Sequence, residues 1–212
     1  MPEPGHPRIR TFHARHGRVT ESMRTALREV GPRHDLARRD TTRPLVLEVG
    51  CGSGEAALAF ADAHPDVDVL ATDVHTPGVA HLLAALDGEP RPNVFVARAD
   101  ALDVLDHELG PRSLAGVHVF FPDPWPKARH HKRRFIRPDV ADLLADRLAP
   151  GGVLLVATDI EDYARQARSV LDAHPSFQGG PAARPDWRPA TGYEAKATAA
   201  GRSASELAYR RT

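Results

Sequence analysis

The chain has 212 residues, of which 42% are hydrophobic, so it is long enough to form one domain with a substantial core. Its 28 basic and 28 acidic side chains balance to a formal net charge of zero, so any basic surface must be segregated by folding. The single cysteine, Cys51, excludes an internal disulfide and a cysteine-rich zinc site, and no apolar run approaches the roughly 20 residues that span a bilayer. With no signal peptide visible, we expect a soluble cytoplasmic protein that binds neither metal nor membrane. The composition leaves the choice between monomer and homodimer open.

The amino-terminal region is basic and poor in apolar periodicity. Residues 1–40 are rich in Arg, His, Gly and Pro, and cationic side chains cluster from Arg8 to Arg18. One short helix is predicted over residues 19–30, ended by Gly31 and Pro32. We therefore interpret residues 1–40 as a partly flexible basic arm and residues 41–212 as the folded domain.

From Leu45 onward, short apolar runs alternate with helical patterns. The predicted strands cover residues 45–47, 67–71, 94–96, 117–121 and 153–157, and the predicted helices cover 55–63, 76–86, 101–107, 137–148 and 160–173. Thr76 is the expected cap of its helix, and Pro77 occupies the first turn. Residues 175–189 are predicted to form a long loop, and residues 205–210 a final edge strand. This alternation predicts an α/β fold with a mostly parallel central sheet and helices on both faces.

A glycine-rich turn follows the first predicted strand. Glu48 precedes Gly50, Gly52 and Gly54, and a helical pattern begins at Glu55. Such turns let backbone N–H groups approach a ligand closely, although a plain tight turn is the simpler alternative. A dinucleotide fingerprint that started at Gly50 would require glycine where Glu55 stands, so that pattern does not fit.

Acidic residues follow the other predicted strands. Asp73 lies about twenty residues beyond the glycines, where a carboxylate can accept both ribose hydroxyls of an adenosine ligand. Asp100 follows the third strand, and for both residues a helix N-cap is the alternative role. Because the carboxyl ends of parallel strands meet at one edge of a sheet, we expect Glu48, Asp73, Asp100 and Asp123 to converge there.

The segment from Phe121 to Phe135 joins one carboxylate to a block of basic side chains. Three prolines frame Asp123 and Trp125, which predicts a stiff loop that neither continues a strand nor enters a helix. The cationic side chains that can hold phosphates are Lys127, Arg129, Lys132, Arg133 and Arg134. We assign Trp125 to the core rather than to base stacking. The alternatives are an exposed loop with a solvated charge run and, for Asp123, a structural role in capping the next turn.

The run Phe121-Pro122-Asp123-Pro124-Trp125-Pro126-Lys127, with the basic cluster after it, resembles the signature of the bacterial tRNA (guanine-N7)-methyltransferases. The turn after Glu48 resembles the first motif of Rossmann-like methyltransferases that bind S-adenosylmethionine. Further similar segments are Arg10-Thr11-Phe12, His16-Gly17-Arg18-Val19-Thr20, Val74 to Ala80, Ala157-Thr158-Asp159 and Thr191-Gly192-Tyr193-Glu194. The resemblance implies a Rossmann-like class I methyltransferase fold.

The resemblance also implies an activity and a set of site residues. Members of the family methylate the variable-loop guanosine of tRNA at N7, with S-adenosylmethionine as methyl donor. Cofactor-binding positions are implied at Glu48, Gly50, Gly52, Gly54, Asp73, Asp100 and Asp123, and substrate contacts at Lys127, Asp159, Thr191 and Glu194.

Guanine N7 has a free in-plane lone pair, so its methylation needs no strong general base. Asp123 is the predicted catalytic residue, because its carboxylate can accept hydrogen bonds from guanine N1–H and the exocyclic amine and can balance the charge that develops on the ring. The target base must first be exposed or flipped from the folded tRNA. Two alternatives remain, which are another S-adenosylmethionine-dependent methyltransferase acting on an amine and a tRNA-binding module without catalysis.

Overall fold

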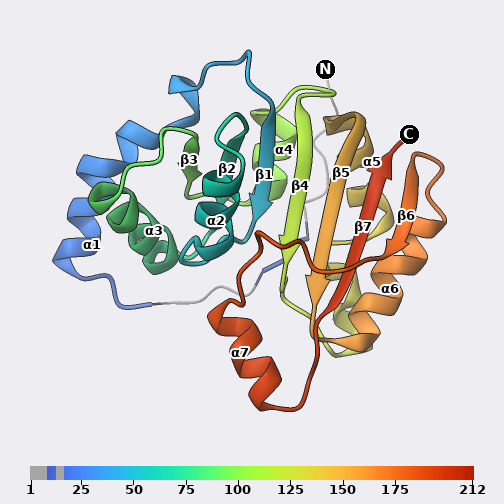
Figure 1. The fold of residues 1–212 in the computed structure, drawn as a ribbon. Helices are drawn as coiled ribbons and strands as arrows, with labels where there is room; N and C mark the ends of the chain where they lie inside the picture. The colour runs from blue at the N-terminus through green and yellow to red at the C-terminus, as the bar shows by residue number, and fades with distance from the viewer. Residues whose placement is uncertain (1–8, 13–16) are drawn as a thin grey trace.

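The computed structural model describes residues 9–12 and 17–212, which form one seven-stranded sheet flanked by helices (Figure 1). Part of the expected basic arm, including Arg8, Arg15 and His16, lies outside the described residues. The strands are β1 (Leu45–Val49), β2 (Asp68–Thr72), β3 (Val94–Ala97), β4 (Leu114–Phe120), β5 (Leu148–Thr158), β6 (Phe177–Pro181) and β7 (Ser205–Arg211). Their order across the sheet is β3-β2-β1-β4-β5-β7-β6.

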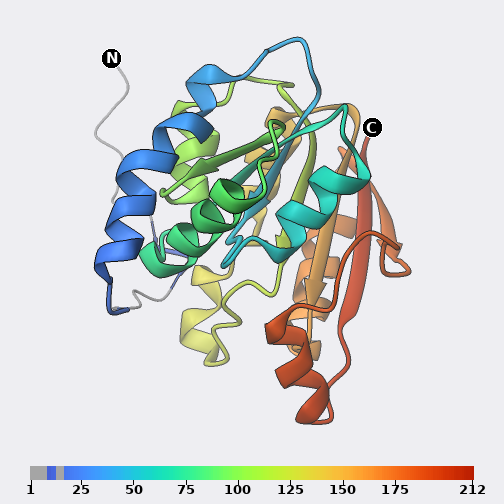
Figure 2. The same ribbon diagram turned by 60° about the vertical axis from the view of Figure 1, so that its left-hand side comes forward.

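The first five strands are parallel, as the alternation of strands and helices predicts. The helices of the domain are α2 (Glu55–Ala63), α3 (Thr76–Gly88), α4 (Ala101–His107), α5 (Pro138–Arg147), α6 (Glu161–Asp172) and α7 (Gly192–Ala199). Helices α2 and α3 bury side chains with β1 and β2 in one cluster, whereas α4, α5 and α6 share a second cluster with β4 and β5 (Figures 1 and 2). The sheet is therefore covered on both faces, and its strand order reverses between β1 and β4, where ligands of such sheets bind.

The predicted helix over residues 19–30 is divided into segments of different pitch. Helix α1 (Glu21–Thr25) runs into a π-helical turn over Ala26–Val30 and then a 3₁₀ turn over Gly31–His34. Gly31 and Pro32 do not end the helical path, because proline is tolerated in the first turn of a new helical segment. This part of the arm packs on the domain, since Ala26 and Val30 share a buried cluster with Val79 and Leu83 of α3 (Figure 2).

Two local expectations were wrong in detail. The N-cap of α3 is His75, which makes no side-chain cap bond, and Thr76 is the first helical residue. A 3₁₀ turn covers Ala128–Arg133, so the stiff loop gives way to a helical turn inside the basic segment. A short 3₁₀ segment also covers Leu36–Arg38, capped by the side chain of Asp35.

The carboxyl-terminal region differs most from the sequence-based expectation. The predicted loop over residues 175–189 contains β6, and the predicted edge strand β7 lies between β5 and β6, antiparallel to both. The sequence of β6 does not predict a strand, because glycine and proline are rare in strand interiors. Gly179 is required there, since a Cβ atom at this position would lie 2.1 Å from the carbonyl oxygen of Ala208. Helix α7, which has no clear apolar stripe, was not predicted.

Candidate active site

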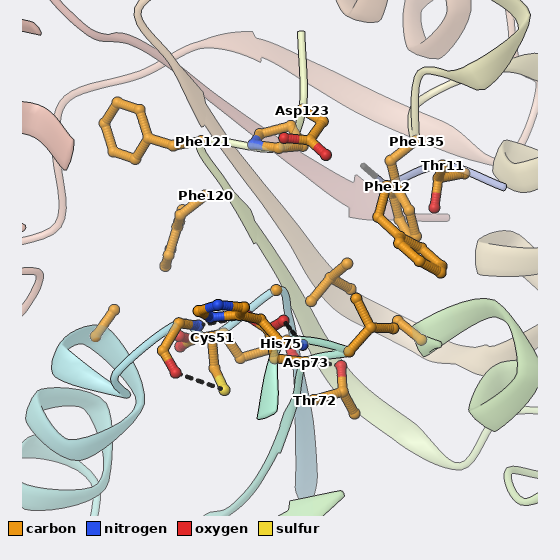
Figure 3. A pocket seen from close by; sticks show the side chains of 18 of the residues that line it. Thr11, Phe12, Cys51, Thr72, Asp73, His75, Phe120, Phe121, Asp123 and Phe135 are labelled. Atoms are coloured by element: carbon orange, nitrogen blue, oxygen red, sulfur yellow. Dashed lines mark hydrogen bonds between the residues drawn. The ribbon is translucent and has the colours of Figure 1, made fainter. Parts of the chain in front are cut away.

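A cavity of about 380 Å³ opens beyond the carboxyl ends of β1, β2 and β4. Its size is typical of small-molecule sites. Of the residues expected to form a site, the structure brings Glu48, Gly50, Gly52, Asp73, Asp100, Asp123 and Thr191 to its walls. Gly54, Lys127, Asp159 and Glu194 do not line it. Residues to which the sequence analysis assigned no role in the site also line it, including Thr11, Phe12, His75, Phe120, Phe121 and Phe135 (Figure 3).

The glycine-rich turn is built from left-handed backbone. Gly50, Gly52 and Gly54 have φ values of 71°, 56° and 85°, which side chains rarely tolerate. The N–H groups of Gly50 and Cys51 both donate to the carbonyl oxygen of Thr72, at 2.8 and 2.9 Å. No heavy atom lies within 4 Å of a Cβ built at Gly50 or Gly52, so the backbone of the turn faces open space in the cavity.

Asp73 organises this turn. One carboxylate oxygen accepts a hydrogen bond from Gly52 N at 2.8 Å, and the other accepts from His75 N at 2.7 Å. Each carboxylate oxygen retains a second lone pair, so Asp73 can accept further donors from a ligand. The N-cap alternative is wrong for Asp73, because α3 is capped by His75.

For Asp100, the N-cap alternative is confirmed. Its carboxylate accepts from Leu102 N at 3.0 Å at the start of α4. The same residue lines the cavity, so capping and exposure to a ligand coexist. The cap holds the carboxylate in a fixed position at the cavity wall.

Glu48, which lines the cavity, forms a buried pair with His118 of β4. Their side chains are each 4% exposed, and His118 Nδ1 lies 4.0 Å from Glu48 Oε2. Among the described residues neither of these two atoms has a hydrogen-bond partner. Burial raises the pKa of the Glu48 carboxyl to about 8 and lowers the pKa of His118 to about 3, so both side chains are largely neutral near pH 7.

Asp123 stands in a turn with unusual backbone geometry. Phe121 and Trp125, on either side of it, have φ values of 49° and 44°, a conformation uncommon for residues other than glycine. Phe121 N donates to the carbonyl oxygen of Ala157 at 2.8 Å, which fixes the turn to the end of β5. In Figure 3, Asp123 lies between Phe120 and Phe121 on one side and Phe12 and Phe135 on the other.

Trp125 belongs to the core, as predicted, because it is only 5% exposed. Its indole Nε1 donates to the carbonyl oxygen of Thr11 at 2.9 Å. The guanidinium carbon of Arg133 lies 4.8 Å from the centre of its ring. The ring therefore fastens the amino-terminal segment, including Phe12, against the cavity, a role that the sequence did not indicate.

Of the four predicted substrate contacts, three lie outside the cavity and one lines it. Lys127 is exposed at the start of the 3₁₀ turn. Asp159 accepts from Arg202 at 2.7 Å, and Glu194 is paired with Arg184 and Arg188. Thr191 does line the cavity, and its hydroxyl oxygen is buried without a hydrogen-bond partner among the residues that the structure describes.

The expected phosphate-binding role of Arg134 was wrong. Its side chain is fully buried, donates to the carbonyl oxygen of Pro124 at 2.9 Å and pairs with Asp162 at 2.5 Å. The buried guanidinium therefore stabilises the proline-rich loop from beneath. The side chains of the segment that reach solvent are Lys127, Arg129, Lys132 and Arg133, which we name the basic block.

Neither a metal cluster nor a membrane span is found within the described ranges. No group of three or more His, Cys, Asp or Glu side chains in residues 9–12 and 17–212 is arranged to hold a metal ion. The same residues contain no helix with the length and apolar character that crossing a bilayer requires.

Comparison with known proteins assigns the family. A family model described as "Putative methyltransferase" matches residues 42–207. A tRNA (guanine-N(7)-)-methyltransferase of Streptomyces coelicolor is 46% identical over 220 residues, which cover 96% of this chain and 81% of that protein. Its counterpart in Thiobacillus denitrificans is 44% identical over 218 residues, which cover 97% and 96%. The chain belongs to the tRNA (guanine-N7)-methyltransferase family.

Solved structures of other methyltransferases resemble this tRNA (guanine-N7)-methyltransferase family member in fold. A precorrin-6y C5,15-methyltransferase from Geobacter metallireducens aligns with a TM-score of 0.56 and 13% identity, covering 89% of this chain and 85% of that chain. An rRNA methylase from Streptococcus thermophilus aligns with a TM-score of 0.54 and 13% identity, covering 92% and 99%. The predicted Rossmann-like class I methyltransferase fold is thereby confirmed.

Proposed function

We propose that this chain transfers the methyl group of S-adenosylmethionine to N7 of a guanosine in the variable loop of tRNA. The single observation that carries the proposal is one cavity that is lined by Asp73, Asp100 and Asp123, the last of which stands in the proline-framed turn. Family membership supports the reaction, since the relatives named above are tRNA (guanine-N(7)-)-methyltransferases.

The cavity fits S-adenosylmethionine in chemistry. The side-chain-free backbone at Gly50 and Gly52 suits close approach by the methionine portion, and Asp73 suits the ribose hydroxyls. Asp100 is suited to the adenine, and Glu48 is proposed to line the cofactor site at the end of β1. Gly54 serves indirectly, because a Cβ there would lie 2.4 Å from Leu82, so glycine lets α2 and α3 pack closely.

When bound, S-adenosylmethionine supplies an electrophilic methyl group on a sulfonium sulfur. The residues of the chain have the task of placing guanine N7 in line with that methyl group and of stabilising the cationic ring that results. Asp123 is proposed to do both, by accepting hydrogen bonds from guanine N1–H and the exocyclic amine. No proton needs to leave N7, so no general base is assigned.

The substrate residues divide into two groups by position. Thr191 is proposed to contact the base or ribose directly, because its buried hydroxyl faces the cavity without a partner among the described residues. Asp159 and the basic block, which includes Lys127, are proposed to contact tRNA outside the cavity. Glu194 is proposed to act through its ion pairs with Arg184 and Arg188.

The experiment that tests the proposal is incubation of the protein with methyl-labelled S-adenosylmethionine and unmodified tRNA, followed by nucleoside mass spectrometry. We expect label in 7-methylguanosine from the variable loop. Label in a base methylated on an exocyclic amine would favour another RNA methyltransferase activity. Tight tRNA binding without any labelled nucleoside would favour a non-catalytic binding module.

A further inference from the structure

One fully buried arginine, Arg188, contacts helix α7, strand β7 and the turn that leads to Asp123. The side chain of Arg188 is 0% exposed, and its Nη1 lies 3.1 Å from Glu194. Its Nη2 pairs with Glu206 at the start of β7. A guanidinium can serve two carboxylates at once, which the single ammonium of lysine does less well. Arg188 therefore connects the helix α7 that carries Glu194 to the central sheet.

The same guanidinium lies over the aromatic residues that precede Asp123. Its central carbon is 5.2 Å from the ring centre of Phe120 and 5.7 Å from that of Phe121. These distances are within the range of a cation–π contact. Phe121 also has left-handed backbone. Its N–H donates to the carbonyl oxygen of Ala157, the residue that lies opposite Glu206 in the pairing of β5 with β7. Arg188 thus packs against a strained turn without itself lining the cavity.

The loop that follows Arg188 forms part of the cavity wall. Thr191 and Gly192 line the cavity, and Gly192 N donates to Glu55 at 3.2 Å. On the other side of Arg188, Trp187 stacks on buried His118, with ring centres 5.1 Å apart. The loop is held at these points. Trp187 and Arg188 both contact Phe120, with the Trp187 ring centre 6.1 Å from that of Phe120, and Arg188 also lies over Phe121 in the turn leading to Asp123.

We propose that Arg188 is a positioning residue that sets the distance between Thr191 and the Phe121–Asp123 turn, and that Glu194 and Glu206 act as its two anchors. This inference deepens the proposed function and rests on it, because Thr191 and Asp123 are the groups assigned to the guanosine. Arg188 itself does not line the cavity, so its effect on methylation must pass through the residues that do.

The test compares Arg188→Lys with Glu206→Gln, a milder change that leaves the guanidinium and the Glu194 pair in place. We expect the single-turnover methylation rate at saturating S-adenosylmethionine and tRNA to fall about 10- to 100-fold in Arg188→Lys and about 3- to 10-fold in Glu206→Gln. Cofactor affinity, measured by calorimetry, should change by less than about threefold in both. Arg210→Gln, a change elsewhere on β7, is the matched control and should methylate at the wild-type rate.

A coupling measurement separates positioning from general support of the fold. If Arg188 acts by placing Thr191, then Arg188→Lys should slow a Thr191→Val protein much less than it slows the wild type. Amide hydrogen exchange should also rise in residues 185–194 of Arg188→Lys while β1 and β4 keep their protection. Fully additive rate effects, or an equal rise in exchange throughout the sheet, would overturn the proposal.

Two further outcomes are informative. If Arg188→Lys does not fold, the methylation rate of Glu206→Gln tests the proposal in its place. A wild-type rate in Glu206→Gln would show that Arg188 is not a positioning residue. A wild-type protein that produces no 7-methylguanosine would refute the proposed function instead, and the exchange measurement would still test whether Arg188 holds the loop.

Discussion

Trp125 Nε1 donates a 2.9 Å hydrogen bond to the carbonyl oxygen of Thr11, a residue more than a hundred positions earlier in the chain. The bond joins the proline-rich loop to the amino-terminal segment, and both border the cavity. The loop that carries Asp123 and the segment that carries Phe12 are therefore held in one arrangement.

Replacement of Trp125 by Phe removes this donor and keeps an aromatic ring. We expect the free energy of unfolding to fall by about 1 kcal/mol, the usual contribution of one hydrogen bond, with some further loss from the smaller ring. We also expect weaker cofactor binding, because Thr11 and Phe12 lose their anchor at the cavity wall. Urea unfolding and calorimetry check the two effects, and unchanged affinity would mean that the amino-terminal segment does not contribute to the pocket.

Asp73→Ala should weaken the binding of S-adenosylmethionine by about 1.5–3 kcal/mol, the range for hydrogen bonds to a charged group. The structure adds a second reason, because the same carboxylate orders Gly52 and His75. Calorimetry with the wild type and the variant measures the difference. An affinity equal to that of the wild type would remove Asp73 from the cofactor site.

Asp123→Asn keeps the size of the side chain and one acceptor, but it removes the charge and turns a second acceptor into a donor. We expect the methylation rate to fall roughly 10²- to 10³-fold, as for the loss of one preorganised electrostatic element, with a much smaller change in cofactor affinity. Single-turnover rates at saturating cofactor and tRNA provide the test. A defect that disappears at high cofactor concentration would instead place Asp123 in cofactor binding alone.

The affinity for tRNA should fall steeply as salt concentration rises, because phosphate contacts release counterions. The double replacement Arg129→Ala and Lys132→Ala, which changes two exposed members of the basic block, should make the salt slope shallower by roughly 0.7–0.9 for each lost contact. Arg168→Ala, an exposed cation of α6, is the matched control. Equal slopes in the block variant and the wild type would show that the block is solvated surface.

The buried pair of Glu48 and His118 predicts a distinctive dependence of stability on pH. The pKa of Glu48 is raised from 4.5 to about 8, so the folded chain holds a proton that the unfolded chain has released. The pKa of His118 is lowered from 6.5 to about 3, so below pH 6.5 the unfolded chain binds a proton that the folded chain lacks. Between about pH 4.5 and 6.5 the effects of Glu48 and His118 on the pH dependence of stability have opposite signs. Above pH 6.5 only the effect of Glu48 remains.

We therefore expect the free energy of unfolding to fall as pH rises from about 6.5 to 8, with a slope of up to about 1.4 kcal/mol per pH unit for one proton. Glu48→Gln, which is neutral at all pH values, should remove this slope. Urea unfolding at four pH values in this window measures it. The same slope in wild type and variant would show that Glu48 does not carry the proton.

The sequence by itself determined the local framework of the site. The apolar runs of β1, β2 and β4 indicate strands that are covered on both faces of a parallel sheet. The glycines after Glu48 can adopt left-handed backbone at low cost, so they favour a tight turn at this point of the chain. Asp73 and Asp100 could be placed at the cavity because parallel strands end at a common edge. These features depend on residues that are near one another in the chain or on the general geometry of parallel sheets.

Only the tertiary structure decided which distant groups meet. Nothing in the local pattern distinguishes Arg134, which is buried on Asp162, from exposed Lys132, or shows that Arg188 pairs with Glu194 and Glu206. The same holds for β6, whose glycines are tolerated because the backbone of β7 lies against them. In each case the position of the residue depends on a partner that is distant in the sequence. The contact between the two forms only when the chain folds, so no local pattern in the sequence reveals it.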